Sequence, residues 1–170
     1  KNGVKKFFYP SSDLVYPDSP KKLSAQEGLK EDSVYPAQPT SDYGWEKLLA
    51  ERLCADYYSD YHLETRVARF HNVYGPLGTY DGGRERSWAA LCRKIAQASD
   101  GEEIEVWGDG EQTRSYCFVS DCVEGVYRLM TSNIRIPINI GSDRLVSINQ
   151  MVSIISNIAK KNIKIKHDLT

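Results

Sequence analysis

The chain has 170 residues, of which 41% are hydrophobic and 26% charged, and its formal net charge is −1 at pH 7. This composition is typical of a globular protein, and the lack of excess positive charge argues against a nucleic-acid partner. No run of 18 apolar residues occurs, so we expect neither a membrane span nor a secretory signal. The four cysteines show no C-x-x-C spacing and no accompanying His cluster, so we expect no metal site. Free thiols are typical of a reducing compartment, which predicts a cytoplasmic location.

The first third of the chain predicts a strand, a long loop and a helix. An apolar run predicts a buried strand over residues 4–9. Residues 11–16 then leave its carboxyl end, where ligands collect in parallel α/β sheets. Residues 17–41 are rich in proline and polar side chains, which indicates a loop with a helical turn near residues 24–29. Ser41 and Asp42 are suited to cap a helix over residues 43–60.

The middle of the chain alternates between strand and helix patterns. We expect a strand over residues 65–70, a Gly/Pro-rich loop over 75–83 and a helix over 85–98. Short strands are expected over 103–106 and 113–118.

The last third continues the alternation. Ser120 and Asp121 are expected to cap a helix that ends near residue 130. A strand over 136–140, a helix over 147–160 and a last strand over 163–166 follow. Strands that alternate with helices predict an α/β fold with a parallel sheet.

One pattern suggests chemistry. Tyr43 and Lys47 are four residues apart, so on a helix they lie on the same face and bring an ammonium beside a phenol. The positive charge favours the phenolate, and a Ser from the preceding strand end could hold a substrate oxygen beside it. Such groups move a proton on or off an alcohol while a nicotinamide accepts hydride. The alternative is a core tyrosine and a solvated lysine on an ordinary helix.

Five segments carry a family resemblance: residues 7–16 (FFYPSSDLVY), 43–47 (YGWEK), 69–76 (RFHNVYGP), 107–121 (WGDGEQTRSYCFVSD) and 139–142 (NIGS). In order and spacing they resemble the extended short-chain dehydrogenase/reductase family of nucleotide-sugar epimerases and dehydratases. The resemblance implies a Rossmann-like parallel sheet. It also implies that the dinucleotide-binding βαβ part and the end of the substrate domain lie outside this chain, because no G-x-x-G-x-x-G or G-x-G-x-x-G motif occurs. Residues 1–75 would then form the later half of the core, and 76–170 a mixed core and substrate-binding region.

The resemblance implies NAD as the cofactor and assigns roles near the strand ends. Ser12, Tyr43 and Lys47 match the family's catalytic residues, and Lys47 would also contact the nicotinamide ribose. The cofactor side would further include Ser11, Phe70, Asn72 and Val73. The alternatives are a strand-end turn for Ser12 and a turn-forming amide for Asn72.

A nucleotide-sugar substrate is implied as well, and the segments GGRER, AALCRK and WGDGEQTRS point to a GDP-hexose. Basic side chains at a loop and a helix start suit a diphosphate, although a solvated basic face is the alternative. The implied substrate-binding residues are Asn72, Gly82, Arg84, Lys94, Trp107, Gln112 and Arg114.

Three positions depart from the family's patterns or suggest a different reaction. The family's 3,5-epimerases use a Cys and a Lys as ring acid/bases, where this chain has Leu14 and Arg86. Leucine carries no proton, and a guanidinium is a poor proton shuttle although it can bind an enolate. Asp13 matches the acid of the family's 4,6-dehydratases, but Leu14 stands where their base would be; a turn-capping carboxylate is the alternative. We therefore predict an epimerase that acts through a transient 4-keto sugar. A 4,6-dehydratase, a 4-keto reductase or a catalytically silent sugar-nucleotide-binding relative are the alternatives.

The resemblance further implies a homodimer formed by two helices per subunit. The helices over residues 43–60 and 85–98 are the candidates. Leu48, Leu49 and Tyr57 would be exposed only where no partner covers them.

Overall fold

The computed structural model describes residues 3–17 and 29–169, which divide into two compact units. Unit 1 combines Lys1–Val73 with Tyr116–Asp143, and unit 2 combines Tyr74–Ser115 with Arg144–Thr170. The chain therefore leaves unit 1, returns to it, and leaves it again.

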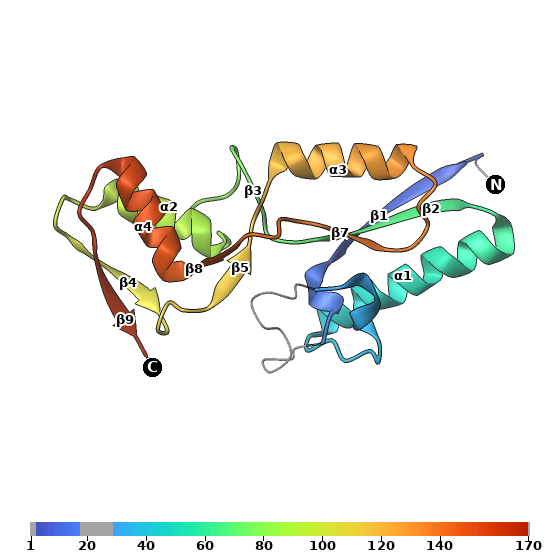
Figure 1. The fold of residues 1–170 in the computed structure, drawn as a ribbon, viewed down its shortest axis with the longest axis horizontal. Coiled ribbons are helices and arrows are strands. Elements are labelled where there is room, and N and C mark those ends of the chain that lie inside the picture. Colours follow the sequence, from blue (N-terminus) through green and yellow to red (C-terminus); the bar gives the residue numbers. More distant parts are fainter. Residues whose placement is uncertain (1–2, 18–28, 170) are drawn as a thin grey trace. The chain divides into compact units, whose positions relative to one another are not determined.

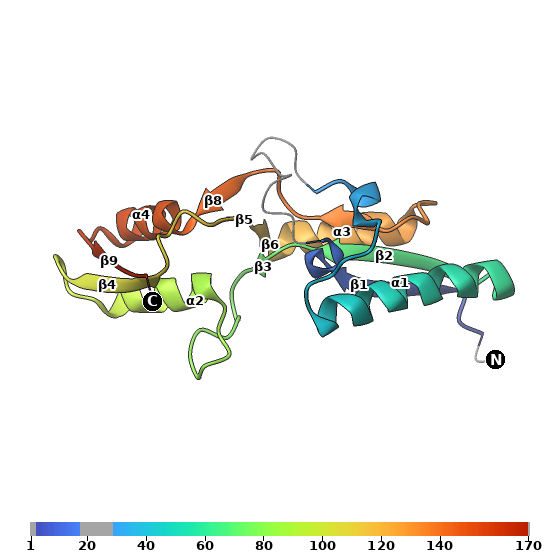
Figure 2. The ribbon, with the colours of Figure 1, turned by 90° about the horizontal axis from the view of Figure 1, so that it is seen from below.

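Unit 1 is built on a three-stranded parallel sheet in the order β1 (Lys6–Ser12), β2 (Glu64–Phe70), β7 (Ile138–Ile140). The helix α1 (Asp42–Tyr61) packs on one face and α3 (Val119–Thr131) on the other (Figures 1 and 2). The central strand β2 is buried along most of its length, as expected for a parallel strand covered on both faces. The predicted α/β fold with a parallel sheet is confirmed.

The helix α1 begins and ends where the sequence indicates. The Ser41 hydroxyl accepts a hydrogen bond from the Gly44 amide (3.1 Å), which satisfies a free donor of the first turn. The helix ends at His62, whose left-handed backbone (φ 56°) lets its amide bond the Tyr58 carbonyl. The helix predicted over residues 43–60 is therefore confirmed.

Two short 3₁₀ helices lie between β1 and α1. The first, η1 (Asp13–Val15), follows β1 directly, and η2 (Glu31–Val34) lies in the stretch expected to be a loop. Most of the helical turn predicted over residues 24–29 lies outside the described residues.

The prediction of a single strand over residues 113–118 is wrong, because the two halves of this segment pair with different strands. The strand β5 (Thr113–Ser115) pairs antiparallel with β8 (Leu145–Ser147), whereas β6 (Cys117–Phe118) pairs with β3 (Val73–Tyr74).

The capping prediction for the helix that follows is also wrong. Phe118 is the N-cap of α3, with no side-chain capping bond, and Ser120 and Asp121 lie inside the first turn. There the carboxylate of Asp121 still interacts favourably with the helix dipole.

Unit 2 contains the helices α2 (Ser87–Gln97) and α4 (Ile148–Ala159), which pack against each other, and the parallel pair β4 (Glu103–Trp107) and β9 (Lys164–Asp168). Ser147 and Gln150 form a capping box at the start of α4. In the part of the chain that the structure describes, no helix is both long and apolar enough to cross a bilayer.

Candidate active site

The first turns of α1 lie directly against the carboxyl end of β1. The Lys47 ammonium donates a hydrogen bond to the Pro10 carbonyl oxygen (2.8 Å). At Gly44 a Cβ atom would overlap the Leu14 carbonyl oxygen and come within 2.9 Å of the Pro39 Cβ. Glycine therefore allows the start of α1 to touch the turn that follows Ser12.

Tyr43 and Lys47 are paired as predicted. The Lys47 Nζ atom lies 5.4 Å from the centre of the Tyr43 ring and 5.0 Å from the centre of the Tyr9 ring. Burial raises the pKa of the Tyr9 phenol, and the Lys47 charge and hydrogen bond lower it in part. Tyr43 is 49% exposed, so its hydroxyl edge is accessible in this chain. The arrangement places one positive charge between two phenols.

Ser12 ends β1 and begins η1. Its hydroxyl donates to Asp13 Oδ1 (3.1 Å) and accepts from the Leu14 amide (3.2 Å). The turn-forming contact considered from the sequence is therefore present. A catalytic role for the same hydroxyl, and for Asp13, remains a prediction. Leu14 is 47% exposed and offers only carbon at that position.

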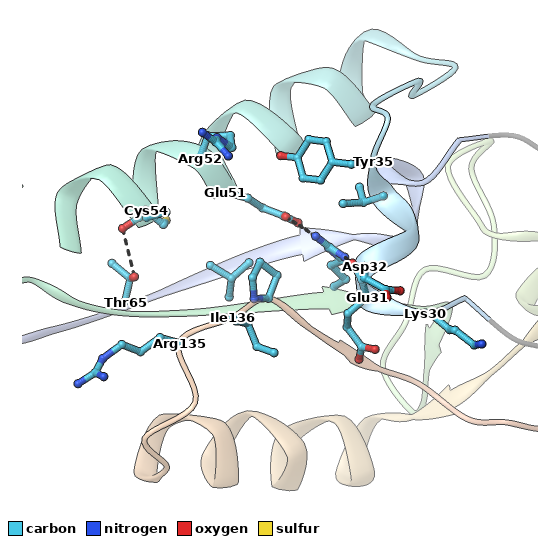
Figure 3. Close-up of a pocket in the computed structure, with 15 residues that line it drawn as sticks. Lys30, Glu31, Asp32, Tyr35, Glu51, Arg52, Cys54, Thr65, Arg135 and Ile136 are labelled. Carbon is cyan, nitrogen blue, oxygen red and sulfur yellow. Dashed lines mark hydrogen bonds and ion pairs between the residues drawn. The ribbon is translucent and has the colours of Figure 1, made fainter. Parts of the chain in front are cut away.

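Ser11 turns into the core. Its hydroxyl donates a hydrogen bond to Glu51 Oε1 (2.5 Å). Arg69 donates two more to the same carboxylate: Nε to Oε1 (3.0 Å) and Nη2 to Oε2 (2.7 Å). The predicted cofactor contact of Ser11 remains a prediction, and its side chain is engaged inside unit 1. Glu51, which Figure 3 shows extending from α1, and its partner Arg69 both line a cavity of about 620 Å³.

The network that contains Glu51 and Arg69 was not foreseen from the sequence. One signal existed, because Glu51 follows Lys47 by four residues and so continues the row of Tyr43 and Lys47 along α1. Arg69 offered no comparable signal, because β2 also contains Glu64, Thr65 and Arg66.

The other cofactor candidates follow β2. Phe70 packs against Phe8, with ring centres 6.2 Å apart, and Val73 packs on the same core. The Asn72 carbonyl accepts a hydrogen bond from the Cys117 amide (3.1 Å). Both apolar side chains are thus engaged in the core of unit 1, and the contacts of these three residues with a cofactor remain predictions.

The substrate candidates of unit 2 lie on two parts of that unit. Trp107, at the end of β4, is 77% exposed, and its carbonyl accepts from the Gln112 side chain (3.3 Å). Arg114 on β5 is exposed and donates to the Thr113 carbonyl (2.8 Å). Lys94 is on α2 instead, where its ammonium donates to the Glu105 carbonyl (2.9 Å).

The loop before α2 holds the remaining candidates. Gly82 and Gly83 have φ angles of +82° and +79°, a backbone that other residues rarely adopt. Arg84 and Arg86 are exposed beside them, and Arg86 is the N-cap of α2. These side chains are accessible to an anionic ligand.

Metal ligands do not gather in this chain as far as it is described: no group of three His, Cys, Asp or Glu side chains is placed to hold an ion. The four cysteines are free thiols, and three of them are buried.

Comparison with known proteins identifies relatives along the whole chain. The chain is 51% identical to GDP-mannose 3,5-epimerase 1 of Oryza sativa over 166 residues, which is 98% of this chain and 43% of the relative. It therefore spans less than half the length of that enzyme. GDP-mannose 3,5-epimerase of Arabidopsis thaliana is 48% identical over the same share of this chain.

Solved structures show the same fold. The UDP-glucuronic acid 4-epimerase of Bacillus cereus, in complex with UDP-glucuronic acid and NAD, is 26% identical with a TM-score of 0.73. The match covers 97% of this chain and 49% of that one. The sequence profile of the NAD dependent epimerase/dehydratase family matches residues 1–141, so the resemblance found in the sequence is confirmed. The chain belongs to the NAD dependent epimerase/dehydratase family.

Proposed function

We propose that this chain carries the catalytic residues of an NAD-dependent nucleotide-sugar epimerase that acts on a GDP-hexose through a transient 4-keto sugar. The observation that carries the proposal is the approach of α1 to the end of β1, with the Lys47 ammonium 2.8 Å from the Pro10 carbonyl and beside the Tyr43 ring. The similarity to two GDP-mannose 3,5-epimerases supports the substrate class.

Each catalytic side chain has a distinct role in this proposal. Tyr43 as phenolate takes the proton of the C4 hydroxyl and returns it when the keto sugar is reduced. Lys47 places its positive charge beside Tyr43, with Nζ 5.4 Å from the centre of the ring. Ser12 donates a hydrogen bond to the C4 oxygen after exchanging its present partner, Asp13.

The donor set at this end of the sheet fits the nicotinamide-ribose part of NAD. Lys47 and Tyr43 provide an ammonium and a phenol suited to ribose hydroxyls, and Asn72 and Val73 add main-chain groups near the β2 end. NAD, when bound, supplies reversible acceptance of the C4 hydride.

The diphosphate of the substrate is assigned to cations and amides. Arg114 and Arg84 are exposed guanidinium groups that can bind phosphate oxygens in pairs. Asn72, Gln112 and Trp107 complete the proposed substrate contacts, and a role for Lys94 requires that it release the Glu105 carbonyl.

The ring chemistry is proposed to differ from that of the 3,5-epimerases. Leu14 supplies no acid or base, and a guanidinium such as that of Arg86 is a poor proton shuttle. Chemistry at C4 requires neither of them. A C4 epimerisation is therefore the form of the proposal that these residues support best.

A second candidate is a 4,6-dehydratase, in which the carboxyl group of Asp13, placed beside Ser12 (3.1 Å), would serve as the acid. A 4-keto reductase would use the same serine, tyrosine and lysine. A silent sugar-nucleotide-binding relative would bind the substrate without turnover.

Proton NMR in D₂O separates these candidates. The protein that contains this chain is incubated with NAD and GDP-mannose, and the sugar is analysed for new isomers and for deuterium. An isomer changed at C4 without deuterium supports the proposal. Deuterium at C3 or C5 would instead establish 3,5-epimerase chemistry, and loss of the C6 hydroxyl a dehydratase. Binding without turnover of any nucleotide sugar would identify a silent relative.

A homodimer is also proposed, with α1 in its interface. A row of exposed apolar side chains at four-residue spacing runs along this helix: Trp45, Leu49, Leu53, Tyr57 and Tyr61, with exposures from 49% to 72%. Leu48, by contrast, is buried within unit 1. The second candidate helix, α2, buries Leu91 and Ile95 in its own unit, so support for the dimer rests on α1. A cytoplasmic location remains a proposal that fractionation of cells would test.

A further inference from the structure

A row of three polar side chains ties α1 to the sheet. Tyr43, Lys47 and Glu51 follow one another at four-residue steps and therefore lie along one side of the helix. Lys47 bonds the Pro10 carbonyl, and one turn later Glu51 accepts from the Ser11 hydroxyl. Because two successive turns contact two successive residues of β1, the helix cannot slide or rotate without breaking both contacts.

Arg69 connects this row to the rest of the sheet. It is paired with Ser11 in the register of β1 and β2, and its side chain is 3% exposed, like that of Glu51. Besides its two bonds to Glu51, Arg69 donates to the Tyr16 hydroxyl (2.9 Å) and to the Glu31 carbonyl (2.9 Å).

The network extends to the third strand. The Tyr16 hydroxyl donates to Asn139 Oδ1 on β7 (2.8 Å). The carboxyl ends of all three strands of the sheet are thus linked to α1 through buried polar groups. Burial lowers the pKa of the Arg69 guanidinium, but the bonds to Glu51 and Tyr16 outweigh it and leave the pKa raised, so the cation is retained.

A buried ion pair is weak evidence of a stabilising role, since well-packed apolar side chains in the same place are often equally stable. Here the pair supplies a defined geometry, because the two N–H groups of a guanidinium bind both carboxylate oxygens in one orientation.

We propose that Glu51 and Arg69 are positioning residues that set α1 against the end of β1 and so fix Tyr43 and Lys47 relative to Ser12. The consequence for catalysis rests on the proposed function; the geometric part does not. Arg69 and Glu51, the latter labelled in Figure 3, also line the cavity beside α1.

The test compares three variants with one control. Ser11→Ala removes one contact and leaves the ion pair, Glu51→Gln removes the charge at nearly constant shape, and Arg69→Lys removes the fork. The control is Arg128→Gln, which breaks an exposed pair with Glu124 on α3 (2.7 Å).

The geometric readout is the amide NMR spectrum of this 170-residue chain. We expect all three variants to shift the resonances of residues 12–15 and 43–47, and the control to leave them unchanged. The kinetic readout uses the protein that contains this chain. There we expect kcat to fall at least tenfold with KM within about threefold, because small misplacements of reacting groups cost rate more than binding.

The two readouts separate the two proposals. If the wild-type protein turns over no nucleotide sugar, the proposed function fails and the NMR comparison still decides the positioning role. Variants that lose thermal stability but keep wild-type resonances at residues 12–15 and 43–47 would show a merely structural network and overturn the inference. If Glu51→Gln does not fold, the NMR spectrum of Ser11→Ala decides the positioning role, because this variant keeps the ion pair between Glu51 and Arg69.

Discussion

Replacing Gly44 with alanine tests the close contact between α1 and the turn after β1. On an unobstructed helix the change would stabilise the chain, because alanine is favoured over glycine by about 1 kcal/mol. Here the added methyl overlaps the Leu14 carbonyl oxygen and lies 2.9 Å from the Pro39 Cβ. Overpacking costs about 1–3 kcal/mol, and a backbone obstacle places this case at the upper end. We expect a net loss of about 1–2 kcal/mol, or a decrease in Tm of about 2–8 °C for a chain of this size.

Thermal unfolding followed by circular dichroism measures the effect, and Gly125→Ala is the matched control. Gly125 also lies inside a helix, but a Cβ there meets only side-chain atoms of Ile140, at 3.2 Å. Because a side chain can shift more readily than a backbone carbonyl, we expect the control to lose less stability than Gly44→Ala. A Gly44→Ala chain as stable as the wild type would refute the tight approach, and with it the argument that glycine sets the distance from Tyr43 to the end of β1.

Three further predictions concern the site, the surface and pH. Tyr43→Phe should lower kcat by about 10²–10⁴-fold with intact folding, as measured by turnover of the nucleotide sugar and by circular dichroism; unchanged turnover would exclude Tyr43 as the acid/base. The double change Leu49→Glu with Leu53→Glu should convert a dimer to a monomer in analytical ultracentrifugation, because it places charges in the exposed row of α1; an unaffected dimer would place the interface elsewhere. Burial raises the pKa of Tyr16 above its ordinary value of 10.0, so the unfolded chain releases this proton first and stability should fall as pH rises above about 10. A Tyr16→Phe chain should show a flatter dependence of Tm between pH 10 and 11, and an equally steep one would contradict this assignment.

Local patterns predicted much of the fold because they are decided within a few residues. The helix α1 follows from a Ser at its N-cap, and the helix predicted over 147–160 corresponds to α4. The parallel sheet follows from apolar runs separated by helices. These signals do not depend on what lies across the molecule.

Features that depend on a distant partner were not predicted, because a local pattern does not show which segments lie together. Residues 113–118 look like one strand, but β5 and β6 pair with different strands, which only tertiary structure decides. Glu51 on a helix suggests a solvated side chain until the buried Arg69 is known to face it. The helical pairing of Tyr43 and Lys47 could therefore be predicted from the sequence, whereas the buried hydrogen bonds between Glu51 and Arg69 could not.

Identity over the whole chain and identity at the reacting positions answer different questions. A 51% identity over 166 residues shows the shared family and fold. The reaction depends on a few groups that can hold a proton beside the sugar ring. At the end of β1 that position is Leu14, whose amide is already bonded to the Ser12 hydroxyl and whose side chain is carbon only. In the proposed function, Ser12, Tyr43 and Lys47 act at C4 without it, whereas inversion at C3 and C5 would need an acid and a base, and leucine and arginine are poor candidates for both. The proposed reaction is therefore confined to C4, and the deuterium content of C3 and C5 is the measurement that tests this restriction.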